Sequence, residues 1–311
     1  MTKPTFSFIL PAYKKRFLAE AIDSIITQSY PDFELVVVDD DSPEGLAELV
    51  QGFNDSRIRY EKNRRNIGGY DLVANWNHCL QFAKNDFVIL ATDDDVMEPD
   101  YLADVVKCLE VHPNVDLVRT CVKKIDSEGN ILEYELLPKE YLSCTEFAYF
   151  GSIGLIACVS NFVFRRDKLI DIGGFVNFPH AHYSDVATAL AMSKQGVACV
   201  QAYHLNFRMS DINLSNTIKP NMAVSQMDAT HMFMEWLERF LEQIEAETKD
   251  HFYTVHAFYG FRLQYLHMMG NLTRKLPLTQ IFKVVHAIFC CHYAYKKEKI
   301  KLLADYLISR L

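Results

Sequence analysis

The sequence has no uninterrupted apolar run of the length that a membrane-spanning helix needs, which is about 18 residues. The longest candidate, residues 281–291, is interrupted by Lys283 and His286. The N-terminal segment is too poor in apolar residues, and interrupted too early by Pro11, for a signal peptide. We therefore expect a cytoplasmic protein, and peripheral contact with the inner face of a membrane stays open as an alternative.

The sequence also has no excess of basic residues over acidic ones. The formal net charge is -8 and the sequence pI is about 5.8. Proteins that bind nucleic acid usually present a strongly basic surface. Nucleic acid is therefore not an expected partner, and any anionic ligand must be held by a local group of residues.

Paired cysteines are the third absence. The eight cysteines form no Cys-x-x-Cys pair, and no histidine stands beside them at zinc-finger spacing. Most of them lie inside apolar runs such as VVKCLEV and LIACVSN. We expect reduced thiols that act as small core side chains in a reducing cytosol.

The first 120 residues contain short apolar runs that alternate with segments of helical periodicity. Runs of strand length stand at Phe6–Leu10, Phe33–Val38, Arg57–Glu61, Phe87–Ala91 and Val115–Cys121, and helical patterns lie near residues 18–26, 44–53, 71–84 and 101–110. Continuous apolar strands that alternate with helices indicate a mostly parallel sheet covered on both faces. The expected fold class is therefore α/β, with a Rossmann-like sheet flanked by helices.

The second half of the sequence is less regular. Residues 122–165 are expected to mix short strands and turns, and a helix is expected over 166–172. Ser184 is a suitable N-cap for a helix that ends near Lys194. From about Asn221 onward the pattern is helical, so a helical C-terminal extension is expected.

The C-terminal region is basic, because residues 274–301 hold seven basic residues and one acidic residue. Two interpretations are open. The region can be a helical pair packed on the rest of the chain, or an amphipathic surface that rests on anionic lipid. Plain packing is the favoured interpretation, because lysines at such positions can simply solvate one face of a helix.

Three of the expected strands are followed by short segments that carry a tyrosine or a cluster of aspartates. They are Pro11-Ala12-Tyr13, Asp39-Asp40-Asp41 and Asp93-Asp94-Asp95. Ligands of open α/β sheets bind beyond the carboxyl ends of the strands, so these residues are expected on one ligand-binding edge. Adjacent carboxylates at such an edge suit Mg2+ or Mn2+ together with a phosphate group. The alternative is a solvated acidic turn before a helix that Asp100 begins.

The segment FSFILPAYKKRFLAEAIDSIITQSYPDFELVVVDDDSPEG resembles the opening of the family-2 glycosyltransferases, which have the GT-A fold. The segment NRRNIGGYDLVANWNHCLQFAKNDFVILATDDD is also similar to that family. The resemblance extends over about residues 5–215 and is specific over 5–100. It implies a glycosyltransferase domain over 1–218, with a nucleotide-binding half (1–100) and an acceptor half (101–218), followed by a helical region over 219–311.

The resemblance also implies how a nucleotide-sugar donor, a UDP-sugar on family grounds, would be held. Asp39 corresponds to the aspartate that accepts a hydrogen bond from the base, and Asp93 to the residue that contacts the ribose. Asp94 corresponds to the carboxylate that binds Mn2+ or Mg2+ on the diphosphate, with Asp95 as an assisting ligand. The other donor-binding positions that it implies are Pro11, Ala12, Tyr13, Asn66, Gly69 and Asn75.

Two positions depart from the family pattern. Thr92 replaces the first acid of the commoner metal-binding motif, and Ser210 stands where many members have a histidine that contacts metal or phosphate. These departures leave the completeness of the metal shell open. Arg208 precedes Ser210 by two positions and can pair with the diphosphate or form a surface salt bridge.

Direct displacement at the anomeric carbon inverts the configuration and requires a base for the attacking hydroxyl. GGFVNFPHAHYSDVATALAM resembles the family segment that leads to an acidic pair at the start of a helix, with Ser184 in place of the first acid. Asp185 is therefore the expected catalytic base, and His180 and His182 are alternatives. A purely structural aspartate at a helix N-terminus is also compatible with the sequence. The implied acceptor is a saccharide or a lipid-linked molecule in surface polysaccharide synthesis.

Two other functions are alternatives to glycosyl transfer. A phosphatase of the haloacid dehalogenase type also places two aspartates after a strand, but it needs Thr or Val two residues beyond the second one. Pro43 and Met97 occupy the corresponding positions here, so both acidic clusters lack that feature. A catalytically degenerate module that only binds a nucleotide-sugar is the second alternative, and it is favoured if Asp185 lies away from the site.

Overall fold

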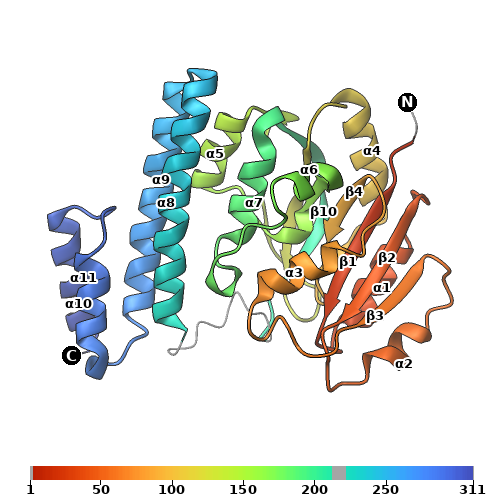
Figure 1. Ribbon diagram of the computed structural model, residues 1–311, viewed down its shortest axis with the longest axis horizontal. Helices are drawn as coiled ribbons and strands as arrows, with labels where there is room; N and C mark the ends of the chain where they lie inside the picture. Colours follow the sequence, from red (N-terminus) through yellow and green to blue (C-terminus); the bar gives the residue numbers. More distant parts are fainter. Residues whose placement is uncertain (1–2, 212–221, 311) are drawn as a thin grey trace.

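The computed structural model describes residues 3–211 and 222–310 (Figure 1). Its centre is a ten-stranded sheet in the order β3-β2-β1-β4-β9-β6-β10-β5, with β7 paired to β6 and β8 paired to β10. Helices cover the sheet, and the C-terminal helices lie to one side of it in Figure 1.

The first half of the sheet is parallel. β1 (Phe6–Ala12) pairs with β2 (Phe33–Asp39) on one side and with β4 (Phe87–Leu90) on the other, and β3 (Ile58–Lys62) pairs with β2. All four strands therefore end at the same edge of the sheet.

The second half of the sheet is mixed. β9 is antiparallel to both β4 and β6, β10 is parallel to β6, and β5 is antiparallel to β10. The strands of this half are β5 (Val96–Met97), β6 (Leu117–Ile125), β7 (Ile131–Tyr134), β8 (Tyr141–Leu142), β9 (Phe162–Arg165) and β10 (Val197–Arg208).

Two hydrophobic clusters lie on the two faces of the sheet. Because side chains alternate along a strand, Phe8 and Leu10 of β1 join one cluster and Ile9 joins the other. The first face is covered by α1 (Leu18–Ile26), α2 (Leu46–Gln51) and α4 (Tyr101–Val111). The second face is covered by α3 (Leu72–Leu80), α5 (Cys144–Ile153), α6 (Arg166–Asp171) and α7 (Ser184–Met192).

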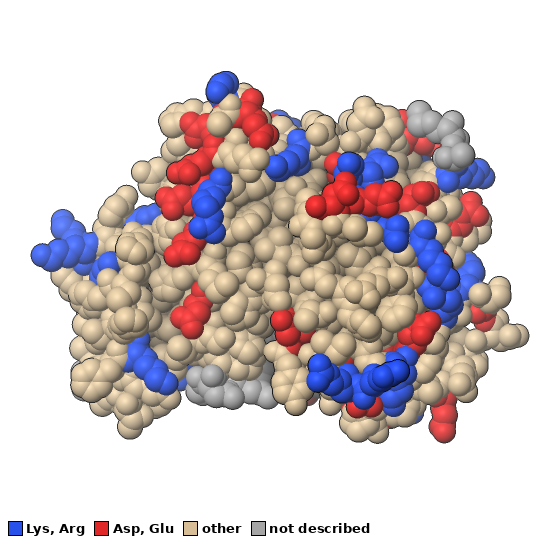
Figure 2. Space-filling view, viewed as in Figure 1, with Lys and Arg blue, Asp and Glu red and all other residues tan. Residues whose placement is uncertain are grey.

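The C-terminal helices extend the second cluster. They are α8 (Ala223–Thr248), α9 (His251–Thr273), α10 (Ile281–Phe289) and α11 (Lys296–Ile308). Phe233 of α8 and Phe261 of α9 belong to the same cluster as Phe147 of α5 and Ala189 of α7. On the face in Figure 2, the left end of the molecule, over α10 and α11, shows scattered Lys and Arg side chains among mostly uncharged ones.

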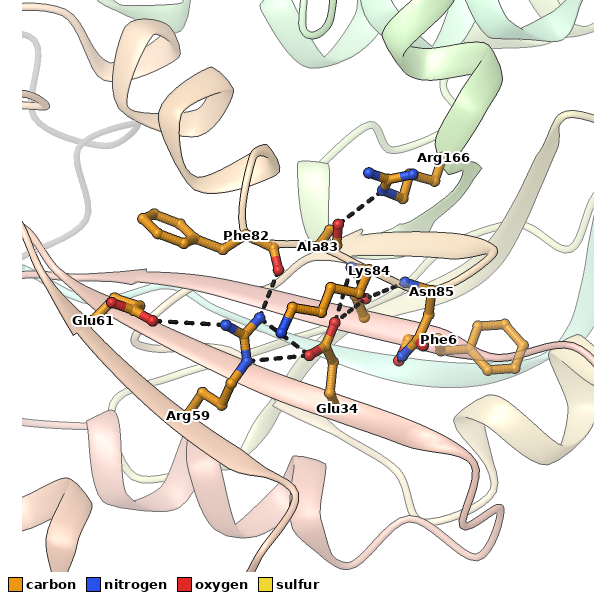
Figure 3. Close-up of polar contacts among 10 residues, drawn as sticks. Phe6, Glu34, Arg59, Glu61, Phe82, Ala83, Lys84, Asn85 and Arg166 are labelled. Carbon is orange, nitrogen blue, oxygen red and sulfur yellow. Dashed lines mark hydrogen bonds and ion pairs between the residues drawn. The ribbon is translucent and has the colours of Figure 1, made fainter.

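Polar contacts fasten the segment that joins α3 to β4, near the amino ends of the strands (Figure 3). The Glu34 carboxylate accepts hydrogen bonds from the Arg59 guanidinium (3.1 Å) and from the backbone N–H of Lys84 (3.0 Å). Arg59 also donates to the Phe82 carbonyl (2.6 Å), and Arg166 donates to the Ala83 carbonyl (2.8 Å). These contacts fix where β4 begins, at the edge opposite the one where the acidic turn lies.

The expected fold class is confirmed: the chain forms an α/β sheet flanked by helices, with a helical C-terminal region. Element ends differ by a few residues from the expectation, as helix and strand ends commonly do. The largest difference is α5, which lies inside the segment expected to hold only strands and turns. Ser143 and Glu146 form a capping box at its start, and this pattern was readable in the sequence.

Two other expectations concern boundaries. Ser184 is the first residue of α7 and not its cap, because Tyr183 holds the cap position with a φ of 67°. The expected boundary between residues 218 and 219 lies outside the described residues. It stays a prediction.

Among the described helices, none is both long and apolar enough to cross a membrane. The eight cysteines are free thiols, and Cys290 is exposed while the others are buried or partly buried.

Candidate active site

The candidate site lies where the order of the strands changes direction. From β1 the chain passes through α1 to β2 and then to β3 on one side, whereas α3 leads back to β4 on the other side of β1. The carboxyl ends of β1 and β4 therefore flank a topological switch point, which is where open α/β sheets bind ligands. Tyr13 follows β1 and Asp93 follows β4 at this point.

Asp93 links the two strand ends. Its carboxylate accepts hydrogen bonds from the backbone N–H groups of Tyr13 (3.0 Å) and Lys14 (2.8 Å). Burial raises the pKa of Asp93, and these two hydrogen bonds partly oppose that effect. The Tyr13 side chain is 42% exposed, so its ring is available at the edge of the sheet.

Asp94 is the next residue of the acidic turn. Burial, followed by the negative charges of Asp95 and Asp93, raises its pKa to about 7. The ionised form of Asp94 is therefore unfavourable in this turn unless positive charge comes close to it.

Asp95 is buried and fastens the turn to two other parts of the chain. Its carboxylate accepts a hydrogen bond from the Ser160 hydroxyl (3.1 Å) and another from the backbone N–H of Arg208 (3.0 Å). Burial raises the pKa of Asp95 to about 6, and the Arg208 hydrogen bond opposes the shift. Each carboxylate oxygen thus already has a protein partner.

The Arg208 side chain is buried and contacts the backbone of the acidic turn. Its Nε donates to the Asp94 carbonyl (2.9 Å), and its guanidinium pairs with Glu20 (2.7 Å) and lies 4.3 Å from the centre of the Phe17 ring. The salt bridge considered for Arg208 is present, and it joins a buried guanidinium to a Glu20 carboxylate that is 53% exposed. The guanidinium is buried because Arg208, the last residue of β10, lies between the acidic turn and α1.

Asp39 lies at the end of β2 and is 1% exposed. Its carboxylate accepts hydrogen bonds from the backbone N–H of Ser42 (2.7 Å) and the Tyr60 hydroxyl (2.5 Å). The Ser42 hydroxyl in turn donates to the Tyr13 carbonyl (2.6 Å). Asp39, Ser42 and Tyr13 therefore form one connected group beside the switch point.

Three other positions expected at the donor site, Asn66, Gly69 and Asn75, lie in or beside a loop that Asp40 holds. The Asp40 carboxylate accepts hydrogen bonds from the backbone N–H groups of Ile67 (2.8 Å) and Gly68 (2.7 Å) and from the Asn63 amide (2.7 Å). Asn63 also donates to Asn75 (3.1 Å), which is 2% exposed.

Asn66 and Gly69 bond to each other within the loop that Asp40 holds. The Asn66 side chain accepts a hydrogen bond from the backbone N–H of Gly69 (2.5 Å), and a Cβ at position 69 would overlap with that side chain. A side chain at position 69 would therefore displace the Asn66 amide from this contact. These contacts fix the shape of the loop beside the switch point, and Asp40 is a residue whose role the sequence did not reveal.

Asp185 lies in the first turn of α7, directly after a strained loop. Three residues without the freedom of glycine have positive φ there: His180 (59°), Ala181 (57°) and Tyr183 (67°). Such conformations cost about 1 kcal/mol or more each and cluster at functional sites. The Asp185 carboxylate accepts a hydrogen bond from the backbone N–H of Val186 (2.8 Å).

The electrostatics of this loop differ between its titratable groups. Burial raises the pKa of Asp185 to about 6, and hydrogen bonds from the helix N-terminus oppose the shift. Burial, followed by the charge of His180, lowers the pKa of His182 to about 4. The Nε2 atom of His182 is buried without a hydrogen-bond partner among the described residues. Histidine at position 182 is therefore neutral near pH 7, whereas Asp185 is mostly ionised.

The charges of Asp95 and Asp185 both act on the thiol of Cys158. Burial raises the pKa of this thiol well above the ordinary value, and the next two causes are the charges of Asp95 and Asp185. Both carboxylates are therefore close enough to Cys158 to act on it. The expectation that Asp185 belongs to the same site as the acidic turn stays a prediction.

The donor set fits a divalent cation that needs help from a phosphate. Among residues 3–211 and 222–310, no three His, Cys, Asp or Glu side chains are arranged to hold a metal by themselves. Mg2+ and Mn2+ commonly bind through one or two carboxylates and the phosphates of a substrate. Asp94, a crowded carboxylate that needs positive charge, fits that arrangement.

The sheet order, the switch point and the acidic turn that follows β4 define an α/β protein of the GT-A class. Within this class, the chain belongs to glycosyl transferase family 2, whose sequence pattern it matches over residues 7–173.

Two relatives illustrate the similarity in sequence. An uncharacterized glycosyltransferase of Methanocaldococcus jannaschii is 31% identical over 146 residues, which are 45% of this chain and 49% of the relative. A GalNAc(5)-diNAcBac-PP-undecaprenol beta-1,3-glucosyltransferase of Campylobacter jejuni is 33% identical over 132 residues, which are 41% of each chain. The chain spans about half the length of the curated relatives that it matches.

Two solved structures illustrate the similarity in fold. Residues 1–349 of S. aureus TarS, in complex with UDP-GlcNAc, superpose with a TM-score of 0.65 at 17% identity, over 98% of this chain and 90% of that one. The mannosyltransferase PcManGT of Pyrobaculum calidifontis, in complex with GDP-Man and Mn2+, superposes with a TM-score of 0.54 at 17% identity, over 99% and 86%.

Proposed function

We propose that the chain is an inverting glycosyltransferase that transfers a sugar from a nucleoside diphosphate sugar to a saccharide or lipid-linked acceptor. The observation that carries the proposal is the acidic turn Asp93–Asp95 at the switch point, in a fold of the GT-A class and a chain of family 2. Membership in this family leaves the phosphatase alternative without support.

In this proposal the end of β1 receives the base and ribose of the donor. The exposed Tyr13 ring offers an apolar surface for the base, and Asp93 holds the backbone of Tyr13 and Lys14 in place. The Asp39 carboxylate would accept a hydrogen bond from the base after the Tyr60 hydroxyl releases one of the Asp39 oxygens. Otherwise Asp39 would act indirectly, by fixing the positions of Ser42 and Tyr13. UDP is the proposed nucleotide, as in the TarS complex.

Asp94 is the proposed ligand of Mn2+ or Mg2+, with Asp95 as an assisting carboxylate. When bound, the cation would act as a Lewis acid that neutralises the charge of the departing diphosphate. The solved structure of PcManGT holds Mn2+ beside its GDP-Man. Because Arg208 fixes both the Asp94 carbonyl and the Asp95 carboxylate, the turn is held in position before any ligand arrives.

Asp185 is the proposed general base. The attacking hydroxyl of the acceptor forms the new bond to the anomeric carbon, the bond from that carbon to the diphosphate breaks, and the hydroxyl proton passes to the Asp185 carboxylate. A pKa of about 6 leaves this carboxylate ionised at pH 7 and still more basic than an ordinary aspartate. Lipid-linked acceptors are proposed because the C. jejuni relative is named as acting on an undecaprenol-linked saccharide.

Nucleotide binding with and without metal tests the proposal. Isothermal titration of the wild-type protein with UDP should show binding that becomes at least about tenfold tighter when Mn2+ is added. Asp94→Asn should remove most of the metal effect, whereas Asp167→Asn, a change of an exposed carboxylate in α6 near the amino ends of the strands, should preserve it.

A wild-type protein that binds no nucleoside diphosphate in the presence of Mn2+ would overturn the proposal. Tight binding of a UDP-sugar without any release of UDP, with a range of acceptors, would support the alternative of a module that only binds. A screen of nucleotide-sugars for metal-dependent hydrolysis then identifies the donor.

A further inference from the structure

Helix α10 is apolar on almost every side. Seven of its nine residues are apolar, and Lys283 and His286 are the exceptions. A helix that is hydrophobic all round is normally enclosed by protein or in contact with lipid. In this chain α10 packs on α11 at the outer end of the molecule, with Val284 and Ile288 buried (Figure 1).

The other side of α10 is open to solvent. Phe282 is 85% exposed and Phe289 is 47% exposed. Seven residues make about two helical turns, so these rings lie on one face, opposite Val284 and Ile288. Leu278, which precedes the helix, is 53% exposed as well. We call Leu278, Phe282 and Phe289 the Phe282 face.

The chain segment that contains the Phe282 face is rich in basic residues. Within residues 274–301 there are seven basic residues against one acidic residue, although the whole chain carries a net charge of -8. The acidic one, Glu298, is paired with Arg262 of α9. Lys275 and Lys283 are exposed beside the face. Figure 2 shows Lys and Arg side chains at this end of the molecule.

We propose that the Phe282 face docks on an anionic lipid surface. The exposed phenylalanine rings enter the boundary between headgroups and acyl chains, and the lysines pair with lipid phosphates. A helix of nine residues is about 14 Å long, so α10 lies in the plane of the surface. The packing expected for this region is thus present on one side of α10 only, and the other side supplies the lipid contact.

Charge decides between a lipid surface and a second copy of the chain. A symmetric dimer places the same patch on both partners. It would bring the lysines of one copy close to those of the other, and like charges repel. An anionic lipid surface complements the same residues. The docking proposal concerns a surface far from the acidic turn, so it stands or falls independently of the donor and the transferred sugar.

Vesicle flotation with the full chain tests the proposal. Wild-type protein should float with vesicles of phosphatidylcholine that contain roughly one third phosphatidylglycerol, and much less with phosphatidylcholine alone. Raising the salt from about 0.1 M to about 0.5 M should release most of it, because screening weakens the charge contacts. The double substitution Phe282→Ser and Phe289→Ser should lower the bound fraction at least about tenfold.

Phe252→Ser is the matched control. Phe252 is also an exposed phenylalanine on a helix, at 60% exposure, but it lies at the start of α9. The control should bind vesicles like the wild type, and circular dichroism should show that all variants fold. Equal binding of wild type and the double variant, or no preference for anionic vesicles, would overturn the proposal. A wild-type dimer that the double variant converts to a monomer would overturn it in favour of a second copy of the chain.

Discussion

Asp185 is the residue whose ionisation matters most for the proposed transfer. A general base must be deprotonated, and burial places the pKa of Asp185 at about 6. With saturating donor and Mn2+, we expect kcat to fall about tenfold per pH unit below pH 6 and to level off above about pH 7. A pH profile of kcat measures this. Asp185→Asn should lower kcat by a factor of about 100 or more and leave donor affinity unchanged.

A change in kcat of less than about threefold in Asp185→Asn would exclude Asp185 as the base. His182 then becomes the first alternative to test. Its pKa of about 4 makes it a weak base, and the profile would shift to lower pH if it served that role.

Burial of the Asp185 carboxylate should also lower the free energy of unfolding above about pH 6. The pKa of Asp185 is raised from its unfolded value of 3.8 to about 6, so the folded state favours the protonated form. Its contribution is favourable below pH 4 and is lost as the pH rises through 6. Asp185→Asn removes this loss, so we expect it to stabilise the protein at pH 8 by on the order of 2 kcal/mol. Urea unfolding at pH 4 and pH 8 measures the difference, which should be much smaller at the lower pH.

The residues of the acidic turn illustrate how far single positions can be read from a sequence. The aspartates were recognisable because they follow an apolar strand. Their partners were not, because Arg208 lies 113 positions after Asp95 and reaches it only through the pairing of β10 with its neighbours. The same holds for Asp40, whose carboxylate holds Ile67 and Gly68 from 27 and 28 positions away.

At the scale of elements, α8 supports the loop that carries the proposed base. Tyr183 precedes α7 in a left-handed conformation, and its ring stacks on Phe233 of α8 at 4.3 Å between ring centres and 6° between planes. Phe178, at the start of the same loop, contacts Phe233 edge-on at 6.2 Å. We therefore predict that Phe233 positions Asp185 through this loop.

Phe233→Leu tests this role while it keeps most of the apolar volume. We expect kcat to fall at least about fivefold with little change in donor affinity, because the loop loses its flat support. Phe240→Leu is the control, since Phe240 stacks on Trp236 of the same helix and not on the loop. Both variants should lose similar stability on heating. Equal kcat values in the two variants would contradict a positioning role for Phe233.

At the scale of the whole molecule, the C-terminal helices are not an independent unit. α8 and α9 share one hydrophobic cluster with α5 and α7. We expect a chain that ends at residue 211 to expose this cluster and to aggregate or to bind the dye ANS strongly. Size-exclusion chromatography and ANS fluorescence measure this. A monomeric truncated chain with cooperative unfolding would show that the first 211 residues fold alone.

The sequence by itself determined the elements and the edge of the sheet where the chemistry was expected. Short apolar runs, helical periodicity and aspartates after strands are local signals, because each depends on residues that are neighbours along the chain. They were enough for the α/β class and for Tyr13, Asp93 and Asp94 at one sheet edge. A capping box at Ser143 was also readable, although the helix after it was not expected.

The tertiary structure decided everything that depends on residues distant in sequence. It buried the Arg208 guanidinium against the acidic turn, and it placed the Asp40 carboxylate where it accepts a hydrogen bond from the loop at Gly68. It also left one side of α10 uncovered. The physical reason is that burial and charge proximity set pKa values and exposure, and both arise only when separate elements pack together.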